Sequence, residues 1–172
     1  MSWLVGVLIV VVAAAAVIDF RTRRIPNWLT FSSLALGLSL QLAMFGGSGL
    51  VQGLLGVLVG TGVFVPFFAL GGMGAGDVKL MGAAGAFLGP GGALWAALFT
   101  GLAGGVLVLF WGLSQGKLGS VFARTGALIK LLDPRHAAAA QLPTLDTGKA
   151  WTIPYGVAIA FGVALSVWWR GV

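Results

Sequence analysis

The sequence predicts an all-α, polytopic membrane protein with six transmembrane helices, and its composition is the first reason. Of the 172 residues, 59% are apolar and 8% are charged, with ten Lys or Arg and four acidic residues. A soluble domain is about one quarter charged, so this composition does not suit a surface that faces water. It also excludes a disordered chain and a nucleic-acid-binding role.

The second reason is the length of the stretches that carry no formal charge, since a spanning helix needs about 20 mostly apolar residues. Glycine and proline clusters at 46–49, 71–74 and 89–92 divide these stretches, because helices turn where flexible or helix-breaking residues allow it. The predicted spans are 2–20, 28–45, 50–70, 77–88, 93–113 and 151–169.

The first predicted span is a retained helix rather than a secretory signal peptide. A signal peptide has its positive charges before the apolar run, whereas here Arg21, Arg23 and Arg24 follow it. In the third span, Gly53 and Gly56 share one face with Gly60 and predict close helix packing. The fourth span is too short to cross a bilayer alone, so it needs shelter from other helices or a water-filled cavity.

Nine of the ten basic residues lie on one side of this six-span topology, and Arg170 lies on the other. The positive-inside rule makes the basic side cytoplasmic and places both termini outside. The cytoplasmic side includes a loop at about 114–150, within one integral-membrane domain of residues 1–172. An apolar stripe between Val121 and Leu132 predicts an interfacial amphipathic helix in this loop, with a plain solvated connection as the alternative.

The ionisable residues limit the possible chemistry. Cysteine is absent and His136 is the only histidine, so thiolate zinc sites, multi-histidine metal sites and cysteine nucleophiles have no material. No metal and no cofactor are expected. Asp19 ends the first span and Asp77 begins the fourth, both on the cytoplasmic side.

Each of these two aspartates also has a simple structural explanation. Asp19 is able to pair with nearby arginines, and Asp77 is a preferred helix N-cap residue. The pair favours a functional site, because carboxylates at membrane depth are costly. Two adjacent carboxylates share a proton, so one takes a proton from water while the other donates to a peptide carbonyl.

Three runs of residues resemble the type IV prepilin peptidases, which are GxGD-type aspartic membrane proteases. Residues 74–80 read Gly-Ala-Gly-Asp-Val-Lys-Leu, residues 19–30 read Asp-Phe-Arg-Thr-Arg-Arg-Ile-Pro-Asn-Trp-Leu-Thr, and residues 153–158 read Ile-Pro-Tyr-Gly-Val-Ala. The chain is similar to the short form that serves tight-adherence (Flp-type) pili, or to archaeal preflagellin peptidases.

The resemblance implies the GxGD protease fold, with Asp19 and Asp77 as the catalytic pair. It implies motif support or substrate binding for the matching residues Gly74, Gly76, Lys79, Pro26 and Asn27. For Lys79, a snorkelling anchor and tuning of Asp77 are both open. The implied substrate is a prepilin or pseudopilin, whose leader precedes a hydrophobic helix and is cut on the cytoplasmic side of the bacterial inner membrane. Methyl transfer is not expected.

Two other functions stay open at this point. A proton- or cation-coupled transporter or channel subunit would use the same carboxylates to bind the ion, with acids near mid-membrane and an internal repeat. A non-catalytic pilus-assembly scaffold would keep the fold and only bind pilins. Either alternative has the lipid bilayer as its environment.

Overall fold

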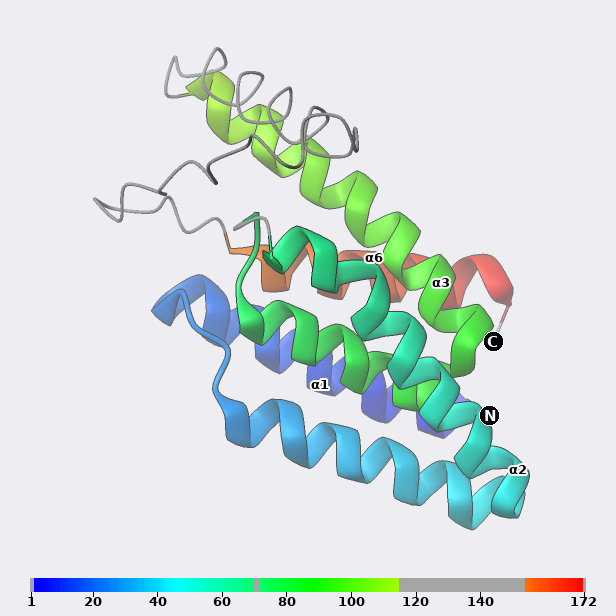
Figure 1. Cartoon of the computed structure of the whole chain (residues 1–172). Helices are drawn as coiled ribbons and strands as arrows, with labels where there is room; N and C mark the ends of the chain where they lie inside the picture. The colour runs from blue at the N-terminus through cyan, green and yellow to red at the C-terminus, as the bar shows by residue number, and fades with distance from the viewer. Residues whose placement is uncertain (1, 70–71, 115–153, 172) are drawn as a thin grey trace, which may run out of the picture. The chain divides into compact units, whose positions relative to one another are not determined.

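The structure is a computed structural model that describes residues 2–69, 72–114 and 154–171, and within these ranges all the regular secondary structure is helical (Figure 1). The helices are α1 (Ser2–Thr22), α2 (Asn27–Ala69), α3 (Ala75–Ser114) and α6 (Tyr155–Arg170). The all-α class predicted from the sequence is therefore confirmed for the described residues. The predicted amphipathic helix and His136 lie outside them.

The chain divides into two compact units, Met1–Gly104 with Ile153–Val172, and Gly105–Thr152. Of the second unit, the structure describes residues 105–114, the last part of α3. All packing and all sites described below belong to the first unit. The single domain of residues 1–172 stays a prediction.

Helix α2 reverses direction at Gly46, where two helices meet across a kink (Figure 1). A straight helix of 43 residues would be about 65 Å long, roughly twice the thickness of a bilayer's hydrocarbon core. Gly46 has φ 64° and ψ −149°, a conformation that is essentially restricted to glycine. The predicted turn at 46–49 thus has the right position, but the reversal takes place at one residue and helix resumes directly after it.

Helix α3 has the same construction at Gly89, with φ 67° and ψ 178°. Pro90 follows, where a missing N–H costs little because it opens a new helical segment. The two kinks coincide with the predicted boundaries at 46–49 and 89–92. The predicted start of the fourth span at Asp77 is two residues late, because α3 begins at Ala75.

The part of α3 before its kink is the most enclosed segment of the first unit. Residues 80–87 are all buried. This agrees with the prediction that the short segment needs other helices around it. Glycines of α2 provide the close approach: a side chain at Gly56 would overlap the backbone of Gly85, and one at Gly60 would overlap the Met81 carbonyl. The predicted packing role of these glycines is confirmed.

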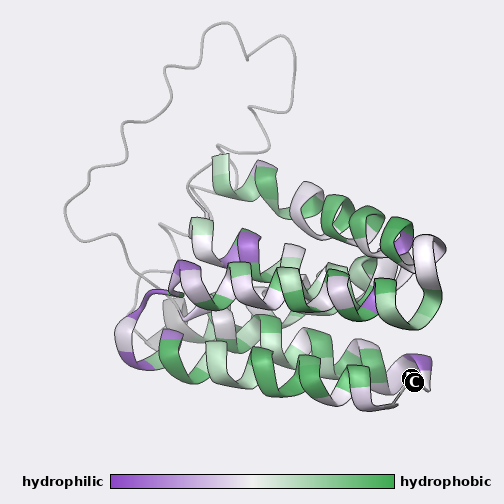
Figure 2. Ribbon diagram, turned by 90° about the horizontal axis from the view of Figure 1, so that it is seen from below, coloured by the Kyte–Doolittle hydropathy of each residue, from purple (hydrophilic) through white to green (hydrophobic). Residues whose placement is uncertain are grey.

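Helix α1 packs against α6 and α2. Its buried side chains recur every three or four residues and form one stripe, which consists of Leu4, Leu8, Val12, Ala15 and Asp19. On the exposed faces of the helices, large apolar side chains predominate, and Figure 2 shows hydrophilic positions gathered near helix ends. Among the residues that the structure describes, three helices are long and apolar enough to cross a membrane: Trp3–Thr22, Asn27–Ala69 and Ala75–Phe110. The number of crossings stays a prediction.

Candidate active site

Asp19 points into the helical bundle at the end of the α1 stripe and is 6% exposed. Its carboxylate Oδ2 accepts a hydrogen bond of 2.9 Å from the backbone N–H of Gly156. Gly156 is the second residue of α6, and the first N–H groups of a helix have no partner within the helix. Asp19 therefore caps a helix that lies 137 residues away in the sequence.

Gly156 allows this contact because it has no side chain. A Cβ atom at this position would lie 2.9 Å from Cβ and 3.1 Å from Oδ2 of Asp19, closer than Cβ atoms come to other atoms in real structures. Pro154 precedes the helix and provides no side-chain cap. The capping group of α6 is thus the aspartate of α1.

The turn after Asp19 returns the chain toward the site. Arg23 has φ 54°, the left-handed conformation that ends many helices. Its backbone N–H donates to the Asp19 carbonyl at 2.7 Å, and its charge acts on the Asp19 carboxylate. The arginine neighbour expected for Asp19 is therefore present, in addition to the bond from Gly156.

Asp77 is the third residue of α3 and is 8% exposed. Its Oδ2 accepts a hydrogen bond of 3.0 Å from the N–H of Gly74, while the Gly74 carbonyl accepts one of 3.1 Å from the N–H of Asp77. The bond from the Gly74 N–H to the Asp77 side chain is one half of a capping box, in which the acid stands three residues after the cap, and glycine has no side chain for the other half. The expectation that Asp77 is itself the N-cap residue is therefore wrong, and Gly74 holds that position.

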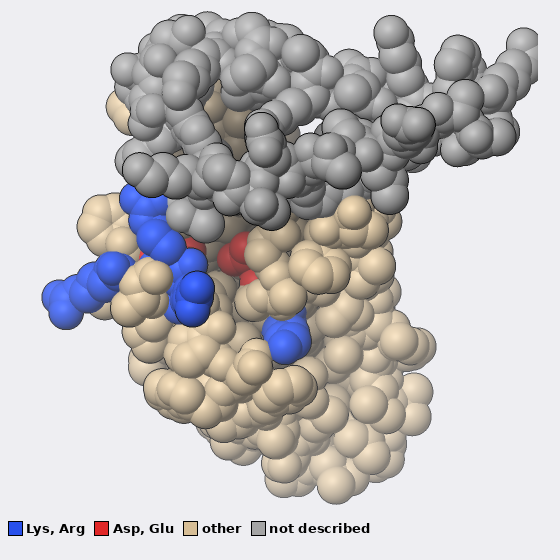
Figure 3. Space-filling model, turned by 60° about the vertical axis from the view of Figure 1, so that its left-hand side comes forward, with Lys and Arg blue, Asp and Glu red and all other residues tan. Residues whose placement is uncertain are grey.

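Asp19 and Asp77 lie at the same end of the first unit and interact electrostatically with one another. Figure 3 shows the acidic atoms of the described residues close together in a hollow, with basic side chains on the same face. Each carboxylate is held on Oδ2 by the N–H of a glycine, one from the start of α3 and one from the start of α6. The structure thus brings together the two acids that the sequence singles out.

Gly76 allows the chain between α1 and α2 to approach Asp77. A Cβ atom on Gly76 would lie 3.1 Å from Cβ and 3.3 Å from the carbonyl oxygen of Ile25. Pro26 follows Ile25, and its carbonyl accepts hydrogen bonds from the N–H groups of Leu29 and Thr30 as α2 begins. Pro26 therefore opens α2 beside the start of α3.

Lys79 connects these two helix starts. Its Nζ donates a hydrogen bond of 2.9 Å to Oδ1 of Asn27 and lies 5.3 Å from the centre of the Phe31 ring. A cation over an aromatic face is attracted by the ring quadrupole. Because the ammonium is engaged with α2, the contacts favour an anchoring role over the tuning of Asp77.

Residues of α6 complete the site, and the sequence interpretation treated them only as part of a motif. Tyr155 has Asp77 as a charged neighbour, and a side chain at Gly104 would lie 2.7 Å from the Tyr155 hydroxyl. Gly156 binds Asp19 directly. The sequence does show a proline followed by an aromatic residue and a glycine at the start of an apolar helix. This pattern predicts where the helix begins, but it does not predict that the helix start contacts Asp19.

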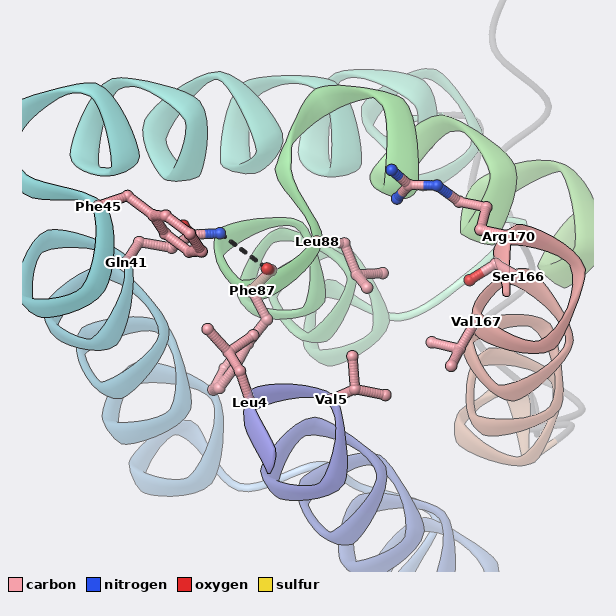
Figure 4. A pocket seen from close by; sticks show the side chains of 9 residues that line it. All are labelled: Leu4, Val5, Gln41, Phe45, Phe87, Leu88, Ser166, Val167 and Arg170. Carbon is pink, nitrogen blue, oxygen red and sulfur yellow. Dashed lines mark hydrogen bonds between the residues drawn. The ribbon is translucent and has the colours of Figure 1, made fainter. Parts of the chain in front are cut away.

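A small cavity lies at the other end of the helices and does not belong to this site. It has a volume of about 80 Å³, room for two or three waters. The lining comes from α1, α2, α3 and α6 (Figure 4) and consists of Leu4, Val5, Gln41, Phe45, Phe87, Leu88, Ser166, Val167 and Arg170. Within it, Nε2 of Gln41 donates to the Phe87 carbonyl at 2.8 Å.

The side chains at the acidic end are suited to acid–base chemistry. Among the described residues, no three His, Cys, Asp or Glu side chains are grouped so that they would hold a metal ion. Two carboxylates with backbone donors and an adjacent phenol remain. Such a pair is able to take a proton from one group and give one to another.

Comparison with known proteins points in the same direction. The model of the type IV leader peptidase family matches residues 6–109, which is more than half of the chain and includes both aspartates. No curated protein and no solved structure matches the chain significantly. Helix α6, which binds Asp19, lies outside the matched range.

Proposed function

Because the chain belongs to the type IV leader peptidase family, we propose that it is an aspartic endopeptidase that cleaves the leader of prepilin-like proteins at the cytoplasmic face of the membrane. Family membership makes the protein a protease of the leader peptidase type. The observation that carries the proposal is the pair of Asp19 and Asp77, which are buried at one end of the first unit, where the charge of Asp19 acts on Asp77.

The proposed reaction is the hydrolysis of one peptide bond by water. One carboxylate is ionised and takes a proton from the water, whose oxygen attacks the scissile carbonyl carbon. The other carboxyl is protonated and donates its proton to the carbonyl oxygen. When the tetrahedral intermediate collapses, the carbon–nitrogen bond breaks. The amine nitrogen takes the proton from the carboxyl that first acted as the base, and a hydroxyl of the gem-diol gives its proton to the other carboxylate, so that one acid and one base remain.

The hydrogen bonds to the two carboxylates support this chemistry. Gly156 and Gly74 each hold one Oδ2, which fixes the plane of each carboxylate without placing a side chain between them. Groups that are positioned in advance act without reorganisation during the reaction. The second oxygen of each carboxylate is proposed to contact the water and the substrate carbonyl.

The flanking residues are proposed to support the substrate. Gly74 is exposed and Gly76 is partly exposed, so that an extended peptide is able to approach Asp77 without meeting a side chain. Lys79, Asn27 and Pro26 are proposed to keep the starts of α2 and α3 in register. A hydrophobic substrate helix would remain in the bilayer beside the apolar faces.

The proposed location is the bacterial inner membrane, with six crossings, both termini outside and the acids toward the cytoplasm. The arginines of the turn after α1 and Lys79 gather near the acids, whereas Arg170 is at the opposite end of α6. This distribution supports the orientation through the positive-inside rule.

Replacement of either acid tests the proposal. Asp19→Asn and Asp77→Asn are each expected to abolish cleavage of a co-expressed prepilin, because the amide is neither base nor acid in the reaction. Asp133→Asn and Asp146→Asn, which lie outside the described residues, are the matched controls and should cleave normally. Processing is measured by the shift in prepilin mobility and by mass spectrometry of the new N-terminus, and full cleavage by either Asp19→Asn or Asp77→Asn refutes the assignment.

Two further measurements distinguish the proposed protease from the two other functions. Ion flux into proteoliposomes that depends on Asp19 or Asp77 would instead indicate a transporter. Capture of a prepilin by wild-type protein that never shortens it would indicate a scaffold.

A further inference from the structure

The first turn of α6 binds one candidate catalytic acid and lies within electrostatic range of the other, although it is outside the part of the chain that matches the family. The Gly156 N–H binds Asp19, and the adjacent Tyr155 has Asp77 as a charged neighbour. This turn is therefore a third component of the site, beside the end of α1 and the start of α3.

Two features make the contact at Gly156 specific. The N–H group is buried with its acceptor, at 2.9 Å, where an unpaired donor or acceptor is costly. The α-carbon is also so close that a Cβ would lie 2.9 Å from Cβ and 3.3 Å from Cγ of Asp19. The Asp19 side chain cannot move away freely, because Asp19 is the last residue of the buried stripe of α1.

The position of the turn is itself fixed by packing. The Tyr155 ring lies against Gly104 of α3, where an added Cβ would be 2.8 Å from two ring carbons. The Val157 N–H donates to the Pro154 carbonyl at 3.2 Å, which leaves the Gly156 N–H directed to Asp19. Residues on both sides of Gly156 therefore hold its N–H in place.

We infer that Gly156 is a positioning residue for catalysis: its N–H holds one oxygen of Asp19, and its lack of a side chain lets the Asp19 carboxylate stand at the distance from Asp77 that the reaction needs. This inference rests on the proposed function of Asp19 and Asp77 as the catalytic pair. Gly156 acts through Asp19, whose Oδ2 its N–H binds.

Gly156→Ala tests this inference, because the added methyl group displaces the Asp19 carboxylate while both acids remain. A displacement of about 1 Å is able to cost about 100-fold in rate. We expect kcat for a purified prepilin to fall about 100-fold, with KM within about threefold of the wild-type value. A change confined to kcat indicates loss of geometry at the reacting atoms rather than loss of substrate binding.

Gly101→Ala is the matched control, since nothing lies within 4 Å of a Cβ at Gly101. It should cleave at the wild-type rate. The thermal unfolding midpoint of each variant in detergent is compared with that of the wild type. Gly156→Ala activity within threefold of the Gly101→Ala activity overturns the inference.

A second variant keeps the test decisive if Gly156→Ala does not fold. Asp19→Glu keeps the carboxyl group and leaves Gly156 unchanged, but moves the carboxylate by one methylene group. It should also lose about 100-fold in kcat, and wild-type turnover would overturn the inference. If the wild-type protein itself does not cleave prepilin, it is the proposed function that fails. If the wild-type protein cleaves and Gly156→Ala cleaves as well as Gly101→Ala, only the role of Gly156 is refuted.

Discussion

At the scale of single residues, a backbone N–H from a glycine holds each buried polar group that defines the acidic end. Asp19 accepts from Gly156 and Asp77 accepts from Gly74. Both glycines lie in the first turn of a helix or directly before one, where N–H groups are available. A glycine at such a place donates a hydrogen bond and also lets the carboxylate come close to the backbone, whereas the side chain of any other residue would keep the carboxylate away.

Gln41 provides a comparable bond at the other end of the helices. Its Nε2 donates to the Phe87 carbonyl, two residues before the kink at Gly89, where helical carbonyls need partners from elsewhere. Gln41→Leu leaves this buried carbonyl unpaired and should lower the free energy of unfolding by about 1–3 kcal/mol. Chemical or thermal unfolding in detergent measures the loss.

Gln52→Leu is the control for this prediction, because Gln52 is exposed on α2. It should change stability little. Equal losses for the two variants would contradict the role given to the Gln41 bond.

At the scale of elements, two single glycines decide how the long helices fold back. Gly46 has φ 64° with ψ −149°, and nothing lies within 4 Å of a Cβ at that position. The cost of a side chain there is thus conformational alone. The same sequence feature, a glycine run between apolar segments, predicts both reversals.

Gly46→Ala should therefore destabilise the protein by about 1–3 kcal/mol, the cost of a residue in a sparsely populated backbone region. Gly47→Ala is the neighbouring control: its Cβ also meets nothing within 4 Å, and its φ is not positive. Gly47→Ala should be neutral or slightly stabilising, because alanine is the better helix former. The unfolding midpoints of both variants test this prediction. Equal losses of stability in the two variants would argue against a conformational role of Gly46.

The helices also show which features of the fold could be predicted from the sequence. Apolar length and glycine runs predicted the helices and their boundaries to within a few residues, because local chain stiffness and solvent determine both. The bond from Gly156 to Asp19 was not predicted, since it joins residues 137 positions apart and no periodicity connects them. The bond from Lys79 to Asn27 was missed for the same reason, although both residues had been singled out by the resemblance.

At the scale of the whole molecule, the orientation in the membrane is the property that most affects function. A leader peptidase must present its acids on the side where the leader is found. In the first unit, Asp19, Asp77 and the arginines after α1 are at one end, while the termini are at the other (Figure 1).

Single cysteines are able to report this orientation, because the chain has none of its own. Thr22 is exposed near the acidic end and Ser48 is exposed beside the kink of α2. In spheroplasts, a membrane-impermeant maleimide should label Ser48→Cys at once and Thr22→Cys only after permeabilisation. The reverse pattern would place the acids outside and refute the proposed topology.

The hydrogen bond between α1 and α6 also has a consequence for biosynthesis. Both acids are synthesised within the first half of the chain, but the N–H that holds Asp19 is added only with Gly156. Chains emerge from their N-terminal end at about 5–20 residues per second, so several seconds separate the second acid from the last part of the site. During that interval Asp19 lacks the N–H that holds it, and the site of the nascent chain is incomplete.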